Sequence, residues 1–146
     1  MNFDNSISKE LPRRSILCGL GLIALGMIPS TAFAEGQVKV LKNGKIEVLI
    51  SKNTALKKVG GVIQFKDNQG KSIALIRTTR AVNGFRAINL SCTHQGVIVE
   101  KTENGWLCKD GHQATYATEG KVLSGPAKMD LRSIPLVANK SKVTVG

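Results

Sequence analysis

The chain has 146 residues and a formal net charge of +11, from 21 Lys and Arg against 10 Asp and Glu. This length suits one domain, and 42% hydrophobic with 21% charged residues excludes a collagen-like, low-complexity or wholly disordered protein. Aromatic residues make up only 4%, so Val, Ile and Leu must supply the core, and three cysteines and two histidines leave few combinations for a site.

Residues 1–34 are typical of an export signal. The pair Arg13-Arg14 precedes an apolar stretch without charged residues, 15–33, which ends in a small-residue processing pattern, Ala32-Phe33-Ala34. Adjacent arginines favour the twin-arginine route, which carries folded cargo and so suits a cofactor inserted before export. We therefore expect a periplasmic protein with a mature chain of 35–146. That chain carries +10, because the signal removes three basic and two acidic residues.

The alternative for the amino terminus is a retained anchor in the inner membrane. The apolar stretch is just long enough to span a bilayer. Its glycines and its proline weaken it as a helix, and the processing pattern favours cleavage.

The mature chain has the pattern of an all-β domain. Short runs rich in Val, Ile and Leu alternate with turn residues, and no long helical period appears. Asn104-Gly105 predicts a hairpin, because both residues tolerate positive φ. We expect one small antiparallel sandwich or barrel. The predicted strands are 38–41, 46–50, 61–65, 72–77, 85–90, 97–100, 106–107, 131–137 and 142–145.

The residues that carry chemistry are confined to one window, 92–112. It contains both cysteines of the mature chain and both histidines, arranged as two mixed pairs with a glycine beside each. The pairs are Cys92-x-His94 and Cys108-x-x-x-His112, and the glycines are Gly96 and Gly111. Glycine lets the backbone approach a ligand closely. A hairpin between the pairs would bring the two loops together, so a site with two sulfur and two nitrogen ligands is expected.

Three structures fit this set of residues. Exported proteins with two cysteines usually pair them, so Cys92 and Cys108 could form a disulfide. Two Cys and two His are also a standard ligand set for tetrahedral zinc. The third is a 2Fe-2S cluster with two thiolates on one iron and two imidazoles on the other, which mixed pairs suit because each loop then reaches both irons.

The motifs resemble those of the Rieske iron–sulfur proteins. Residues 90–96 are similar to the first cluster loop of that family, with its pattern C-T-H-x-G, and residues 106–112 resemble the second. Residues 124–127, Ser-Gly-Pro-Ala, resemble its cover loop. The similarity extends over 82–146 and implies a Rieske-type fold with a cluster-binding subdomain of two loops.

The resemblance also implies roles for individual residues. Cys92 and Cys108 would bind one iron, and His94 and His112 the other, near the surface. Tyr116 resembles the tyrosine that hydrogen-bonds a ligating sulfur. Pro126 lies in the loop that would shield the cluster from water. The implied function is one-electron transfer, with position and hydrogen bonds supplied by the protein.

The sequence departs from the family pattern at three places. The second pair has three residues between Cys108 and His112, where C-x-x-H is usual. Val97 stands where many exported members have a cysteine that bridges the loops. Ala114 stands where quinol-oxidising members usually have a serine. The third departure favours a soluble carrier, or a small subunit of a soluble oxidoreductase, over a quinol-oxidising subunit.

The expected partner is a redox protein or the large subunit of an enzyme, with cytochrome c or a quinol complex as further candidates. Export argues against nucleic acid despite the basic charge, and a membrane is expected only if the amino-terminal segment is retained. Residues 92–116 contain three acidic and two basic side chains, so the cluster end is not expected to be basic. The alternatives are a quinol–cytochrome c reductase subunit with a retained anchor, and a non-redox domain with zinc or the disulfide.

Overall fold

The computed structural model describes residues 32–33, 38–110 and 113–146. This part of the chain consists of strands and turns with one short 3-10 helix, η1 (Thr54–Lys57). The strands are β1 (Ala32–Phe33), β2 (Val38–Val40), β3 (Ile46–Leu49), β4 (Val62–Lys66), β5 (Ser72–Arg77), β6 (Phe85–Asn89), β7 (Glu100–Thr102), β8 (Gly105–Leu107), β9 (Thr115–Ala117), β10 (Val122–Ser124), β11 (Ser133–Ile134), β12 (Leu136–Ala138) and β13 (Lys142–Val145).

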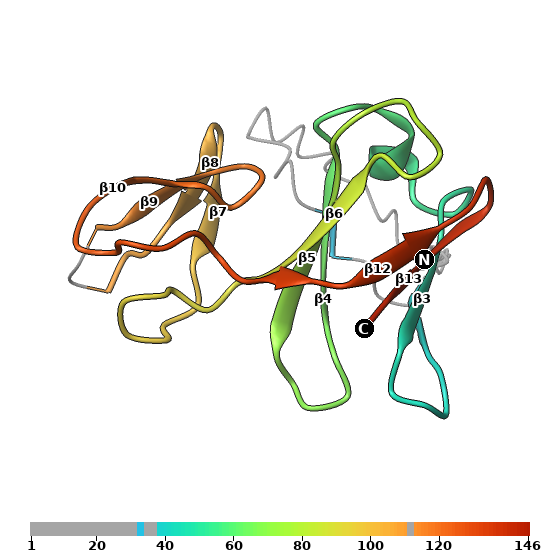
Figure 1. Cartoon of the computed structure of the whole chain (residues 1–146), viewed down its shortest axis with the longest axis horizontal. Coiled ribbons are helices and arrows are strands. Elements are labelled where there is room, and N and C mark those ends of the chain that lie inside the picture. Colours follow the sequence, from blue (N-terminus) through green and yellow to red (C-terminus); the bar gives the residue numbers. More distant parts are fainter. Residues whose placement is uncertain (1–31, 34–37, 111–112) are drawn as a thin grey trace, which may run out of the picture.

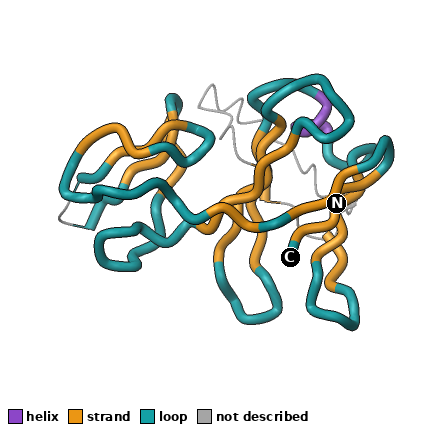
Figure 2. The backbone as a smooth tube through the Cα atoms, viewed as in Figure 1, coloured by secondary structure: helices purple, strands orange, loops and turns teal. Residues whose placement is uncertain are grey.

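The strands form three sheets, which Figure 1 shows in sequence colours and Figure 2 as a tube. The central sheet has the order β1-β4-β5-β6-β11, the second β12-β13-β3-β2, and the third β10-β9-β8-β7. Neighbouring strands are antiparallel except β1 and β4, which are parallel. The predicted all-β class is confirmed.

The central and second sheets pack face to face around an aliphatic core. This core contains buried residues from β3, β4, β5, β6, β13 and η1, which are mostly aliphatic but include Phe65 and Phe85. In β13, Val143 and Val145 are buried and alternate with partly exposed residues, the pattern of a strand with one face on the core. The other face of the central sheet contributes Ala74, Ile76 and Ile88 to a second core. The central sheet therefore forms the wall between two cores.

The third sheet packs on that second core at one end of the molecule (Figure 1). Trp106 and Tyr116 lie opposite each other on β8 and β9 and are almost completely buried. The Trp106 indole N–H donates to the Thr118 carbonyl oxygen at 2.9 Å. Two large aromatic side chains thus hold the subdomain to the central sheet, although aromatic residues are rare in the chain.

The predicted strand 131–137 is wrong in extent: the structure divides it into two strands on either side of Pro135. Strand β11 pairs with β6 in the central sheet, and β12 pairs with β13 in the second. Proline has no backbone N–H to donate to a ladder, so the chain changes sheet at this residue.

The predicted hairpin at Asn104-Gly105 exists, but the glycine is needed for a different reason than the one expected. Thr102 pairs with Gly105, so the turn consists of residues 103 and 104 and Gly105 is already in β8. A Cβ at Gly105 would lie 1.9 Å from the Tyr116 carbonyl oxygen. Glycine is needed here for the close approach of β9. Positive φ in the turn is not the reason, because Gln113 is the one described non-glycine residue with positive φ.

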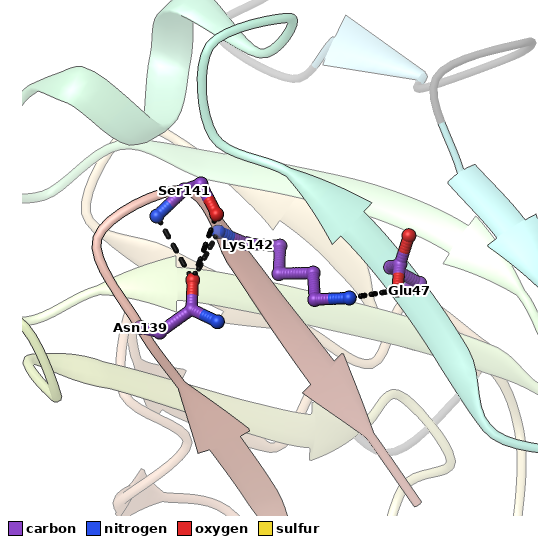
Figure 3. Close-up of polar contacts among 4 residues, drawn as sticks. All are labelled: Glu47, Asn139, Ser141 and Lys142. Carbon is purple, nitrogen blue, oxygen red and sulfur yellow. Dashed lines mark hydrogen bonds and ion pairs between the residues drawn. The ribbon is translucent and has the colours of Figure 1, made fainter.

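The β12–β13 hairpin is held by the side chain of Asn139 (Figure 3). The Asn139 Oδ1 atom accepts hydrogen bonds from the backbone N–H groups of Ser141 and Lys142, both at 2.9 Å, and from the Ser141 hydroxyl. The Lys142 ammonium forms an ion pair with Glu47 of β3 at 2.7 Å. A short polar side chain that accepts from the following residues stabilises such turns.

Two elements were not predicted, β1 and η1. The pair β9–β10 was not among the strands expected from periodicity, but it lies where the family resemblance implied a hairpin after the second loop. Strands of two or three residues are too short to show an alternating pattern. Among the described residues, no helix has the length and apolarity needed to cross a membrane. The predicted signal or anchor lies outside the described residues except for β1.

Candidate metal centre

The first predicted loop begins at the end of β6 and is closed by its own backbone. The Cys92 N–H donates to the Val97 carbonyl oxygen at 2.7 Å, and the Gly96 N–H donates to the Cys92 carbonyl oxygen at 2.7 Å. Gly96 has φ +75, and no atom lies within 4 Å of a Cβ built there. The left-handed turn therefore explains Gly96, whereas crowding by neighbouring protein atoms does not.

The second predicted loop begins at the end of β8. The Cys108 N–H donates to the Ala114 carbonyl oxygen at 2.9 Å, which closes the loop at its base. The predicted ligand His112 and its neighbour Gly111 lie outside the described residues. Cys108 and Ala114 are both fully buried.

The cover loop packs directly on the second loop. A Cβ at Gly125, which has φ +95, would lie 2.5 Å from the Ala114 Cα. Ala127 is buried in the same core cluster as the two cysteines, whereas Pro126 is exposed. The shielding predicted for this loop therefore comes from Ala127 and from the close packing at Gly125.

Figure 1 places the third sheet beside the loop that follows β6. Cys92 belongs to that loop and Cys108 directly follows β8, and both are buried in the same core cluster. Both thiols are free and buried, with 2% of Cys92 and none of Cys108 exposed. Each thiol shifts the pKa of the other, so the two side chains are neighbours. The structure therefore brings together Cys92 and Cys108, which are separated by 15 residues and were predicted to share one site.

Hydrogen bonds make the two thiols electrostatically unequal. Burial disfavours ionisation of Cys92, yet donors that include the Tyr116 hydroxyl and the His94 N–H lower its pKa below the usual value. Burial raises the pKa of Cys108, and the neighbouring Cys92 raises it further. The site thus already carries donors directed at sulfur, as a thiolate ligand requires.

Tyr116 links the first loop to the third sheet. Its hydroxyl lies 3.3 Å from Cys92 Sγ and 3.2 Å from Thr93 Oγ1. The Thr93 N–H donates to the same hydroxyl oxygen at 3.3 Å, and the Thr93 hydroxyl donates to the Met129 carbonyl oxygen at 2.7 Å. Because the Thr93 hydroxyl donates to Met129, the single hydrogen of the Tyr116 hydroxyl has two acceptors within reach, Thr93 Oγ1 and Cys92 Sγ. A charged thiolate is the stronger acceptor of the two. The sequence identified Tyr116 but not this role of Thr93.

Three of the four predicted ligands lie in the described residues, and His94 is exposed on the first loop. The described residues contain no group of three or more His, Cys, Asp and Glu side chains placed to hold a metal ion. Within the described residues, the candidate centre is therefore represented by the two neighbouring thiols and the donors to Cys92.

A cavity of about 380 Å³ adjoins Cys92 and Thr93. Its basic side chains are Lys71, from the turn between β4 and β5, and Arg132, which precedes β11. No acidic side chain of the part of the chain that the structure describes lines it. The expectation that the cluster end is not basic was drawn from the window 92–116 alone. Lys71 and Arg132 come from outside that window, so they add positive charge beside Cys92 that the window does not contain.

A family model described as the Rieske 2Fe-2S domain matches residues 46–135. The chain belongs to this family. No curated protein matches the chain at a significant level. Membership implies electron transfer through a Rieske-type 2Fe-2S cluster bound by cysteines and histidines, and the buried thiol pair with its hydrogen-bond donors fits such a group.

The fold is similar to that of solved Rieske proteins. The cyanobacterial plasma membrane Rieske protein PetC3 from Synechocystis PCC 6803 is 26% identical, with a TM-score of 0.49 over 59% of this chain and 86% of that one. The quaternary ammonium Rieske monooxygenase CntA, in its apo form, is 18% identical with a TM-score of 0.51 over 64% of this chain. The chain matches only 30% of the length of CntA.

Replacement Tyr116→Phe should lower the reduction potential, because the hydroxyl donor stabilises the more negative sulfur of the reduced state. The potential falls by roughly 40 mV for each kcal/mol by which the hydrogen bond stabilises the reduced state more than the oxidised state. A hydrogen bond to a charged group contributes about 1.5–3 kcal/mol in total, which is an upper limit for this difference. Potentiometric titration followed by electron paramagnetic resonance measures the shift. Ser124→Ala, which removes a hydroxyl bonded to Thr115, is the control. Equal potentials for Tyr116→Phe and the control would contradict this role.

Proposed function

We propose that this protein is an exported one-electron carrier, acting as a soluble shuttle or as a small electron-transfer subunit of an oxidoreductase. The observation that carries the proposal is the buried pair of free thiols, Cys92 and Cys108, with the Tyr116 hydroxyl 3.3 Å from one of them. When bound, a 2Fe-2S cluster accepts and releases one electron at a time.

In this proposal the two cysteines hold one iron and His94 and His112 hold the other. The cysteines are buried and their sulfurs are hydrogen-bonded, which limits access of water. His94 is exposed, which suits an exit for the electron toward a partner. These residues would position the cluster and shield it from water. The proposed function is electron transfer alone, so it requires no side chain that catalyses the breaking of a bond.

Cys92→Ser and His94→Ala should each abolish the visible absorption and the paramagnetic signal of the reduced protein, because each removes an iron ligand. Iron and sulfide analysis of protein from cells with intact cluster assembly gives an independent readout. His112→Ala tests the fourth ligand in the same way.

The matched control is Gln95→Ala, whose exposed side chain lies next to His94. Circular dichroism establishes that each variant retains the β fold. A His94→Ala protein with full iron content, or a wild-type protein with zinc in place of iron, would refute the ligand assignment.

A second candidate is a Rieske subunit of a quinol–cytochrome c reductase complex with a retained amino-terminal anchor. Its support is the apolar stretch 15–33. Ala114 argues against it: this fully buried side chain, beside the second loop, has no hydroxyl to donate. The shuttle or small-subunit function is therefore preferred.

The proposed location is the periplasm. Arg13→Lys together with Arg14→Lys should leave the chain in the cytoplasm with its amino-terminal segment intact, because the twin-arginine pair would be lost. Cell fractionation and mass measurement detect both effects. Wild-type protein found in the cytoplasmic fraction would refute export, without affecting the ligand assignment.

We also infer that the redox partner presents acidic side chains to the cavity beside Cys92. The cavity combines Lys71 and Arg132 with an opening onto Cys92 and Thr93, and none of its described lining residues is acidic. Opposite charges speed the encounter of two redox proteins and fix their orientation.

Small charged oxidants test this docking site without knowledge of the natural partner. Lys71→Glu with Arg132→Glu should slow oxidation of the reduced protein by ferricyanide several-fold at low salt, because an attractive field becomes repulsive. A cationic cobalt(III) oxidant should show the opposite change, and both effects should fade in high salt. Stopped-flow absorbance measures the rates. Lys57→Glu with Lys58→Glu makes the same change of charge elsewhere, and an equal effect from it would contradict a local site.

A further inference from the structure

The end of the central sheet opposite the cysteine loops is built from two loops tied together by their backbones. The Gly60 N–H donates to the Arg77 carbonyl oxygen at 2.8 Å, and the Arg77 N–H donates to the Gly61 carbonyl oxygen at 2.9 Å. These bonds hold loop 54–61 against the start of loop 77–84. Strand β6 begins at Phe85, paired with Arg77, and runs away from this end to Asn89, three residues before Cys92.

Basic side chains gather at this end. Two cavities, of about 560 and 310 Å³, share Lys57, Arg77 and Arg80 in their lining. Lys58 lines the first and Lys140 the second, and among the described residues no acidic side chain lines either cavity. We call Lys57, Lys58, Arg77, Arg80 and Lys140 the basic end.

The basic end is held by the fold, since its central member, Arg77, is fixed in place. The Arg77 guanidinium stacks 4.2 Å from the centre of the Phe85 ring and donates to the Arg80 carbonyl oxygen at 3.0 Å. The Asn139 side chain organises the hairpin turn that carries Lys140 (Figure 3). Positive charge without local neutralisation is therefore maintained in one place.

Two exposed valines accompany these charges. Val59 follows Lys58 in one loop and is 53% exposed, and Val82 lies in the other loop and is 46% exposed. Val59 lines the larger cavity and Val82 the smaller. Apolar side chains beside exposed lysine and arginine are the combination with which peripheral proteins enter the boundary of a lipid headgroup layer.

The connection of the chain points to the same surface. Strand β1 is parallel to β4, with Ala32 beside Ile63, next to the loop that carries Lys57 and Val59. The apolar stretch that ends in β1 is therefore joined to the fold at the basic end. In the second candidate function, which retains this segment as an anchor, the basic end would therefore be the end nearest the membrane.

We propose that the basic end docks on the surface of an anionic phospholipid bilayer, with Val59 and Val82 entering the headgroup layer. Anionic headgroups attract each nearby lysine or arginine, and the apolar tips add burial. In this orientation the cysteine loops, at the other end of the central sheet, face the aqueous phase and its redox partners. This inference is independent of the proposed electron-transfer function.

The test is co-sedimentation of the protein, as isolated from cells, with phosphatidylcholine vesicles that contain or lack phosphatidylglycerol. Binding should require phosphatidylglycerol and should be released by salt. Lys57→Gln with Lys58→Gln should weaken it about 25-fold, at about fivefold for each basic side chain removed. Val59→Ser with Val82→Ser should weaken it at unchanged charge.

The matched control is Lys42→Gln with Lys45→Gln, which removes the same charge from the β2–β3 turn. That turn lies at the other end of the sheets, where a Cβ at Gly44 would be 3.4 Å from the Asn68 side chain. Equal weakening by both lysine pairs would mean that net charge alone binds, and would overturn the proposal. Equal binding to vesicles with and without phosphatidylglycerol would assign the membrane affinity to the amino-terminal segment and would also overturn the proposal. Release by inorganic phosphate beyond chloride of equal ionic strength would indicate a small-anion site.

Discussion

The structure depends on the burial of two sulfur atoms side by side. A thiolate in an apolar interior is costly unless donors point at it, and the surroundings of Cys92 meet that requirement from several parts of the chain. The Tyr116 hydroxyl comes from the third sheet, and backbone N–H groups come from the first loop itself. Because the donors belong to separate elements, the site exists only when the third sheet is packed on the central one.

The central sheet serves both ends of the molecule. One of its faces closes the aliphatic core with the second sheet, and the other supports the subdomain that holds the cysteines. The strands β5 and β6 run the length of this wall, so the cysteine loops and the basic end are separated by one strand length. A carrier that is held at one end and transfers electrons at the other needs such a separation.

Close backbone approach, more than turn conformation, decides where several glycines are needed. Gly105 allows β9 to pass at a distance that a Cβ would forbid, and Gly125 does the same for the cover loop on Ala114. Each of these contacts joins segments that are not neighbours in sequence. A pattern of turn residues therefore identifies the right glycine for the wrong reason, as at Asn104-Gly105.

The sequence by itself determined the all-β class, the aliphatic core, most of the longer strands and the residues that carry the chemistry. These features depend on local periodicity and on a rare composition, in which two Cys and two His share one window. Tertiary structure decided the rest. The division of 131–137 between two sheets, the short strands β9 and β10, and the arrival of Lys71 and Arg132 beside Cys92 follow from packing between distant segments. No short-range pattern records such packing, because it depends on how the sheets are stacked.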